Sequence, residues 1–176
     1  MKPAILALLL AVSVAGCSEP SRQSPDVTRD VRSALEQARF TDVSVSQDRE
    51  KGVVTLTGHV TAERDKLQAQ SITQTIAGPQ VVANQIEVRP PGLEREAKKV
   101  TADLDQGIEK NLDAALIQSR LEHEVKYAVA TGVVTLTGEV NSQGRRAEAE
   151  HVAASVPNVT QVVNELQVKD QKATSR

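Results

Sequence analysis

The sequence predicts an α+β protein made of two tandem copies of one small two-layer unit, and three observations lead to this prediction. The seven residues Gly52 to Gly58 recur without change as Gly132 to Gly138. From there the two copies stay aligned, at an offset of 80 residues, as far as Val88 and Val168. The apolar residues follow helix, strand and again helix periods in each copy. We therefore expect the order αββαβ in each unit, with a three-stranded mixed sheet and two helices on one face.

The first element of each unit is predicted to be an amphipathic helix. In the first copy the apolar positions with helical spacing are Val27, Val31, Ala34 and Leu35. Residues at such spacing form one stripe along a helix, which can then pack on a sheet. Asp26 stands directly before the stripe and is a candidate N-cap.

A hairpin and a crossover helix should complete the unit. Val43 and Val45 alternate with polar residues as in a strand, and the turn at Gly52 leads into the repeated strand. The apolar positions that next show helical spacing are Ala69, Ile72 and Ile76. Residues 81–88 then close the unit as a third strand. A helix that crosses over between the last two strands gives a two-layer sandwich.

These patterns divide the chain into segments. The predicted segments are a signal peptide at 1–16, a lipidated tether at 17–25, domains at 26–88 and 103–168, a linker at 89–102 and a disordered tail at 169–176. From Leu93 the apolar residues keep helical spacing into the second domain, which favours a helix from about Leu93 to Arg120. A charged, frayed linker that ends near Thr101 is an equal alternative. Units of this size have marginal cores, so we expect them to lean on one another or to oligomerise.

The N-terminus resembles that of a bacterial lipoprotein. Lys2 precedes an apolar run, Ala4 to Val14, that is too short to span about 30 Å of hydrocarbon. The run ends in Val14-Ala15-Gly16-Cys17, which is similar to the lipobox whose cysteine carries the lipid. The resemblance implies acyl chains such as palmitate on Cys17 and, because Ser18 follows, delivery to the outer membrane. An ordinary secretory signal with an incidental cysteine is the alternative.

The repeated units resemble the BON domain. The resemblance rests on the order αββαβ, the pattern G-V-V-x-L-x-G-x-V and the final pattern V-x-N-x-[IL]-x-V, which both copies carry. With the lipobox in front, the whole chain is similar to dual-BON periplasmic lipoproteins of Gram-negative envelopes. That family implies a non-enzymatic module that supports envelope integrity, in some members by binding anionic phospholipid through the first helix of the second domain. Here that region has Gly107 where lipid-binding members have an aromatic residue, and an acidic surface formed by Asp103, Asp105, Glu109 and Asp113. This surface opposes attraction to an anionic headgroup.

Some residues recur in both copies and are expected to serve the architecture. These structural candidates are Gly52, Gly58 and Asn84, with their counterparts Gly132, Gly138 and Asn164. Gly52 permits the positive φ of a tight hairpin, and Gly58 removes a side chain where a helix approaches the sheet. Asn84 should point inward and find backbone partners.

A small surface of the second domain is the candidate contact site for lipid or partner. Arg145 and Arg146 form the one short basic spot, and they begin a helix whose N-terminus also attracts anions. Ile117, whose counterpart is Glu36, and Leu121 form a small apolar edge. Exposed apolar residues of this kind mark interaction surfaces. A solvated helix face is the default alternative for the arginines.

No constellation of residues predicts catalysis, a metal site or a cofactor. His59, His123 and His151 lack the spacing of metal ligands, and no serine lies in a nucleophile elbow. The chain has 21 basic and 23 acidic side chains and two aromatic residues, so it lacks the basic excess and the stacking groups that nucleic-acid binding needs. The single cysteine excludes an internal disulfide and thiolate-rich metal sites.

Two functions remain as hypotheses. The first is a non-catalytic lipoprotein at the periplasmic face of the outer membrane, anchored through Cys17, whose domains bind anionic phospholipid or envelope proteins and support membrane integrity. The second is a periplasmic stress or folding-support protein that binds proteins and uses the anchor only for location. Vesicle binding discriminates between them.

Overall fold

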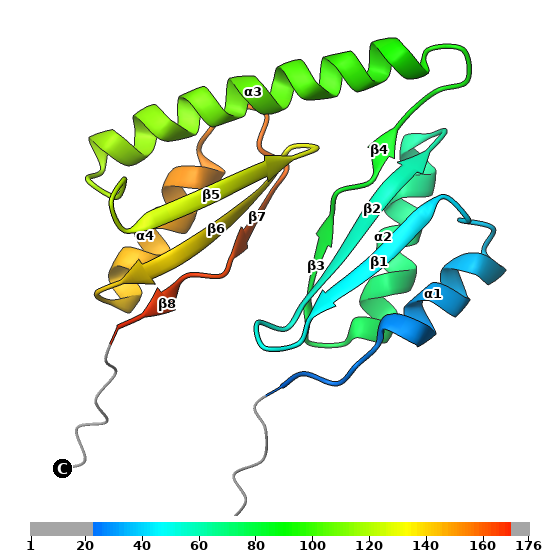
Figure 1. The fold of residues 1–176 in the computed structure, drawn as a ribbon, viewed down its shortest axis with the longest axis horizontal. Helices are drawn as coiled ribbons and strands as arrows, with labels where there is room; N and C mark the ends of the chain where they lie inside the picture. The colour runs from blue at the N-terminus through cyan, green and yellow to red at the C-terminus, as the bar shows by residue number, and fades with distance from the viewer. Residues whose placement is uncertain (1–22, 170–176) are drawn as a thin grey trace, which may run out of the picture.

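The computed structural model describes residues 23–169 and contains two α+β units (Figure 1). The elements of the first unit are α1 (Thr28–Gln37), β1 (Val43–Asp48), β2 (Val53–Val60), α2 (Glu63–Ala77), β3 (Val81–Asn84) and β4 (Glu87–Val88). Those of the second unit are α3 (Glu94–Gln118), β5 (Val125–Ala130), β6 (Val133–Val140), α4 (Gln143–Ala154), β7 (Gln161–Asn164) and β8 (Gln167–Val168). The predicted α+β class is confirmed. The signal peptide, Cys17 and residues 170–176 lie outside the described residues.

Each unit has a mixed sheet around a long central strand. β2 pairs antiparallel with β1 and parallel with β3 and β4. In the second unit β6 pairs antiparallel with β5 and parallel with β7 and β8. The helices cover one face of each sheet. In the first unit the buried residues on this face include Val31, Leu35, Val54, Leu56 and Ala69. Burial of this stripe and strand face is the main stabilising contribution, as expected for an aliphatic core.

The predicted third strand is divided into two short strands. The chain leaves the ladder after Asn84, and the side chain of Asn84 accepts a hydrogen bond from the backbone N–H of Ile86 at 3.3 Å. Ile86 is thereby turned fully into the core. Asn164 makes the same bond to the backbone of Leu166 at 3.2 Å in the second unit. The two-part strand is therefore a repeated feature of the fold.

The two units are linked by a continuous helix. α3 runs without interruption from Glu94 to Gln118, so the structure has the helical linker rather than the frayed one. Its C-terminal half buries Ile108, Leu112 and Leu116 in the core of the second unit. Its N-terminal half extends past that unit toward the end of β4 (Figure 1).

The two units also touch through the sheet faces opposite the helices. Val53 and Ala83 of the first unit form one buried cluster with their repeat counterparts, Val133 and Val163. Gln161 adds two hydrogen bonds to the edge of β3, because its side chain donates to the carbonyl of Val82 at 2.8 Å and accepts from the N–H of Asn84 at 3.3 Å. The ammonium of Lys51 meets the carboxylate of Glu165 at 2.6 Å. The units thus lean on one another through equivalent surfaces.

Candidate interaction surface

The sequence-predicted surface lies where α3 ends and α4 begins. Ile117 is 54% exposed on the last turn of α3. Leu121, however, is fully buried, which corrects the expectation that it shares an exposed edge with Ile117. Leu116 is buried as well. Of the predicted apolar edge, only Ile117 faces solvent.

The end of α3 explains why Leu121 points inward. Arg120 has a positive φ of 53°, which reverses the chain. The N–H of Leu121 then bonds the carbonyl of Leu116 at 2.9 Å, and the N–H of Arg120 bonds that of Ile117 at 3.0 Å. These are the two bonds of a Schellman motif, which brings the residue after the reversal against the helix. α1 ends in the same way, with Phe40 bonded to Leu35 at 2.9 Å. A leucine followed five residues later by another apolar residue, in both copies, is the signal that could have revealed this burial.

Arg145 clamps the end of α3. Its guanidinium donates to the carbonyls of Ser119 at 3.3 Å and Arg120 at 2.7 Å. It also lies 3.5 Å from a carboxylate oxygen of Glu124 and 3.2 Å from one of Glu148. A cation is favourable at a helix C-terminus, where the last carbonyls lack partners. The charge of Arg145 is therefore largely compensated within the chain.

Arg146 is also held by internal partners. Its Nε donates to the carbonyl of Leu166 at 3.1 Å, and an Nη donates to that of Asn164 at 2.9 Å. The side-chain amide of Asn164 in turn donates to the carbonyl of Arg146 at 3.2 Å. This corrects the prediction of an exposed basic spot. The guanidinium groups of both arginines donate hydrogen bonds to backbone carbonyls, so they do not form an open anion site.

The repeated asparagine joins the crossover helix to the split strand. Asn84 donates to the carbonyl of Lys66 at 3.3 Å and to the side chain of Gln70 at 2.9 Å, both on α2. Asn164 makes the equivalent bonds to Arg146 and Glu150 on α4. A buried amide with these partners is satisfied, as burial requires.

The repeated glycines occupy backbone conformations that other residues rarely adopt. Gly52 and Gly132 have φ of 67° and 77° in the hairpin turns. Gly58 and Gly138 have φ of 111° and 124° in the central strands. A Cβ at Gly58 would collide with the carbonyl of Asp42, which corrects the expectation that a helix makes the close approach. The group that approaches Gly58 is the carbonyl of Asp42, just before β1. The N–H of His59 donates a hydrogen bond to this carbonyl at 3.3 Å and so holds it close to β2.

The surface of α3 near Ile117 is acidic. Glu109 and Asp113 are exposed, and the hydroxyl of Tyr127 donates to the backbone carbonyl of Glu109 at 3.3 Å. Burial, followed by the negative charges of Asp113 and Glu109, raises the pKa of Tyr127 above its ordinary value. Asp105 has a different role, since its carboxylate accepts the N–H groups of Thr131 and Gly132, each at 2.8 Å. The exposed carboxylates of Glu109 and Asp113 oppose the approach of an anionic headgroup at this part of α3.

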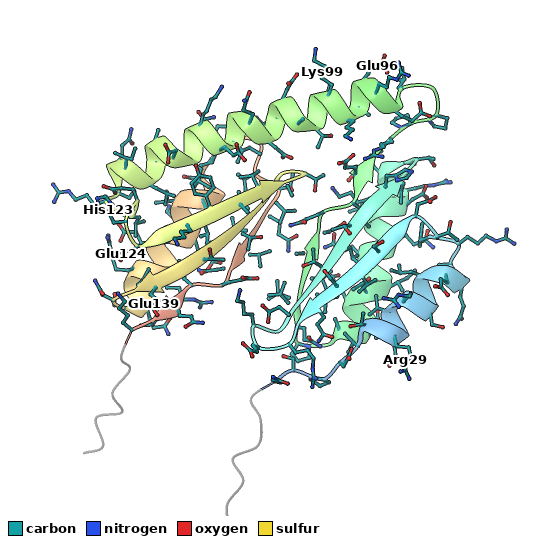
Figure 2. The ribbon with its side chains drawn as sticks, viewed as in Figure 1. Arg29, Glu96, Lys99, His123, Glu124 and Glu139 are labelled. Carbon is teal, nitrogen blue, oxygen red and sulfur yellow. The ribbon has the colours of Figure 1, made fainter. Side chains whose placement is uncertain are left out.

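The three histidines lie on three different elements of the fold. His59 lies in β2, His151 is exposed on α4, and His123 projects into solvent beyond the end of α3 (Figure 2). Within residues 23–169 no group of three or more histidine, cysteine or acidic side chains is placed to hold a metal ion. No helix in that range is both long and apolar enough to cross a membrane.

A hollow lies between the two units beneath α3. Its volume is about 200 Å³, and its lining includes Lys66 and Val88 of the first unit and Leu104 and Asp105 of the second. Small-molecule sites usually have volumes of about 300–1,000 Å³. The hollow is therefore a poor candidate for a ligand site, and the solvent-facing side of α3 remains the better candidate for contacts.

Comparisons with known proteins agree on the two repeated units. The family model for the BON domain matches residues 23–90 and 104–170. The chain is 31% identical over 148 residues to Osmotically-inducible protein Y of Escherichia coli strain K12, over 81% of this chain and 71% of that protein. Two structures of CdsD, a structural protein of the type III secretion system of Chlamydia trachomatis, show 15% identity and weak TM-scores of 0.35 and 0.36. Those alignments cover 82% of this chain and 98% and 92% of the two CdsD chains.

Proposed function

This chain belongs to the BON-domain family, and we propose that it is a non-catalytic envelope protein whose two coupled domains act by binding other proteins. The proposal follows the second hypothesis from the sequence rather than direct recognition of phospholipid. The relative in Escherichia coli is named for osmotic induction. By analogy, this chain serves the envelope under stress.

One observation favours protein over anionic lipid as the ligand. Arg145 and Arg146, the one short basic spot found in the sequence, donate to backbone carbonyls inside the domain. Binding to anionic membranes needs basic groups that are free to approach the surface, each contributing about 1 kcal/mol. The nearby α3 surface carries two exposed carboxylates, Glu109 and Asp113, beside one exposed lysine, Lys110. A partially exposed apolar side chain, Ile117, beside acidic residues suits a protein partner better than an anionic bilayer.

The proposal places the chain at the periplasmic face of the outer membrane. The support is the lipobox-like segment that ends in Cys17, together with Ser18 after it. Two or three acyl chains, at about 0.8 kcal/mol per buried methylene, would give stable anchoring. Mass spectrometry of the purified mature protein tests this directly, because a chain that begins at an acylated Cys17 is expected. An unmodified Cys17 would contradict the anchoring.

Vesicle sedimentation tests the choice between protein and phospholipid. A Cys17→Ser variant, which cannot be acylated on sulfur, is mixed with vesicles of phosphatidylglycerol or of phosphatidylcholine at low ionic strength. We expect the protein to stay in the supernatant with both. Retention on the anionic vesicles alone, lost at high salt, would show phospholipid recognition and contradict the proposal.

A further inference from the structure

The segment that leads to α1 is fastened to the turn between β1 and β2. The N–H of Ser24 donates to the carbonyl of Arg49 at 2.8 Å, and the Nε of Arg49 donates to the carbonyl of Ser24 at 2.9 Å. The carbonyl of Pro25 accepts from the side-chain amides of Gln47 at 2.7 Å and Gln80 at 3.3 Å. From Ser24 onward the chain is therefore held at this end of the first unit. We call this end, at Ser24 and the β1–β2 turn, the attachment end.

α3 lies beyond the opposite end of the same unit. β2 runs from the β1–β2 turn to Val60, whose carbonyl accepts the N–H of Arg89 at 2.8 Å. Arg89 directly follows β4, and α3 begins a few residues later at Glu94. Figure 1 shows α3 along the side of the molecule opposite the start of the described chain. The length of β2 thus separates the attachment end from α3.

Two lengths decide which surfaces can reach a bilayer that holds Cys17. The chain from Cys17 to Ser24, at 3.3–3.6 Å per residue, spans at most about 23–25 Å. The eight residues of β2 span about 26 Å, and a helix with its side chains adds about 10 Å. The outer face of α3 therefore lies roughly 36 Å from Ser24, which is beyond the reach of the tether.

The attachment end has mixed rather than uniformly basic charge. The ammonium of Lys51 lies 3.5 Å from a carboxylate oxygen of Asp48 and 2.6 Å from one of Glu165. Arg29, which Figure 2 shows on the same side of the molecule, has Asp30 as its neighbour in the sequence. Attraction to an anionic bilayer needs a clustered basic excess, so charge alone would hold such a surface weakly. The short tether is the stronger constraint on orientation.

We propose that the acylated protein lies on the bilayer with its attachment end toward the lipid headgroups and the outer face of α3 turned away from them. The inference rests on the acylation of Cys17 proposed above. Glu96 and Lys99, which extend from α3 away from the sheets, mark the surface that faces away from the membrane (Figure 2). This surface is available to protein partners and does not touch the bilayer that anchors the chain.

Fluorescence quenching by headgroup-labelled lipid tests this orientation. The chain has one cysteine, so once Cys17 is acylated an introduced cysteine is the only free thiol. Glu50→Cys and Lys99→Cys place a fluorophore at exposed positions on the attachment end and on α3. Each acylated variant is reconstituted into phosphatidylcholine vesicles that contain lipid with a nitroxide on the headgroup. We expect quenching to be several-fold stronger at position 50 than at position 99.

A longer tether is the matched control. A flexible insert of glycine and serine between Ser21 and Arg22, long enough to double the reach of the tether, leaves both units unchanged. The two positions should then be quenched to similar extents. A difference that persists would show that the attachment end itself binds lipid, and it would overturn the proposal that the tether sets the orientation.

Mass spectrometry of each labelled preparation distinguishes this proposal from the anchoring on which it rests. A chain without acyl groups on Cys17 contradicts the anchoring, and the orientation fails with it. An acylated chain in which position 99 is quenched as strongly as position 50, or more strongly, overturns the orientation and leaves the anchoring intact. Circular dichroism checks that each labelled variant keeps its helices and strands.

Discussion

Replacing Gly58 with alanine should destabilise the first domain strongly. Gly58 has φ of 111°, and a Cβ there would collide with the carbonyl of Asp42. A strained backbone conformation costs about 1–3 kcal/mol, and forcing an extra methyl group into packed surroundings costs about 1–3 kcal/mol. Together these give a loss of roughly 2–6 kcal/mol, which is a large part of the 5–15 kcal/mol of a typical domain.

Urea unfolding followed by far-ultraviolet circular dichroism measures this loss. With a slope of about 2 kcal/mol per M, which is the middle of the usual range for urea, the midpoint for Gly58→Ala should fall by roughly 1–3 M. Gly138→Ala should behave alike, because a Cβ there would collide with the carbonyl of Glu124.

Two other glycines allow the cost of the steric collision to be distinguished from the cost of the strained backbone conformation. Gly78 has φ of 62° and ψ of −118° but no atom within 4 Å of a Cβ, so Gly78→Ala should lose only the cost of the backbone conformation, about 1–3 kcal/mol. Gly107 lies inside α3 with open space, so Gly107→Ala should stabilise by about 0.5–1 kcal/mol. If Gly58→Ala unfolds at the same urea concentration as Gly78→Ala, the close approach does not limit this position and the reasoning fails.

Three further predictions concern the electrostatics and the contact between the units. Tyr127 is the single tyrosine, so its phenolate absorbance can be titrated alone; it should ionise above the ordinary value of 10.0, and Asp113→Asn should lower its pKa. Gln161→Leu leaves two groups on the edge of β3 without partners, which should cost about 1–3 kcal/mol and speed hydrogen exchange at the amide of Asn84. The hydrogen bond that the Lys51 ammonium donates to the carboxylate of Glu165 in the other unit raises the pKa of Lys51, so the stabilisation is present below the ordinary value of 10.5 and lost at higher pH. A fall in melting temperature above that pH should be smaller in Lys51→Met than in wild type.

The duplication made the fold predictable from the sequence. Features that recur in both copies, such as Gly58 with Gly138 and Asn84 with Asn164, identify what the architecture needs. The positive φ and the inward asparagine follow from steric and hydrogen-bonding rules that act locally. The sequence did not predict that the carbonyl of Asp42 is the group that leaves no room for a side chain at position 58. That contact depends on the register in which β1 pairs with β2.

The candidate surface was harder to predict. Leu121 was expected at the surface because helical periodicity was extended past the end of α3, where Arg120 reverses the chain. Counting charges could not show that backbone carbonyls hold Arg145 and Arg146. The contact between the units was hidden as well, since Val53 and Val133 lie on strand faces that alternate as if toward solvent. Tertiary contacts decide all three cases.

Photo-crosslinking in living cells tests most directly whether this protein acts by binding other proteins. A photoreactive amino acid replaces Ile117, which is 54% exposed, and a control replaces Leu67, which is 58% exposed on α2 of the other unit. We expect adducts of defined protein mass from position 117 under osmotic stress and none of them from position 67. Adducts with phospholipid alone at position 117 would contradict the account.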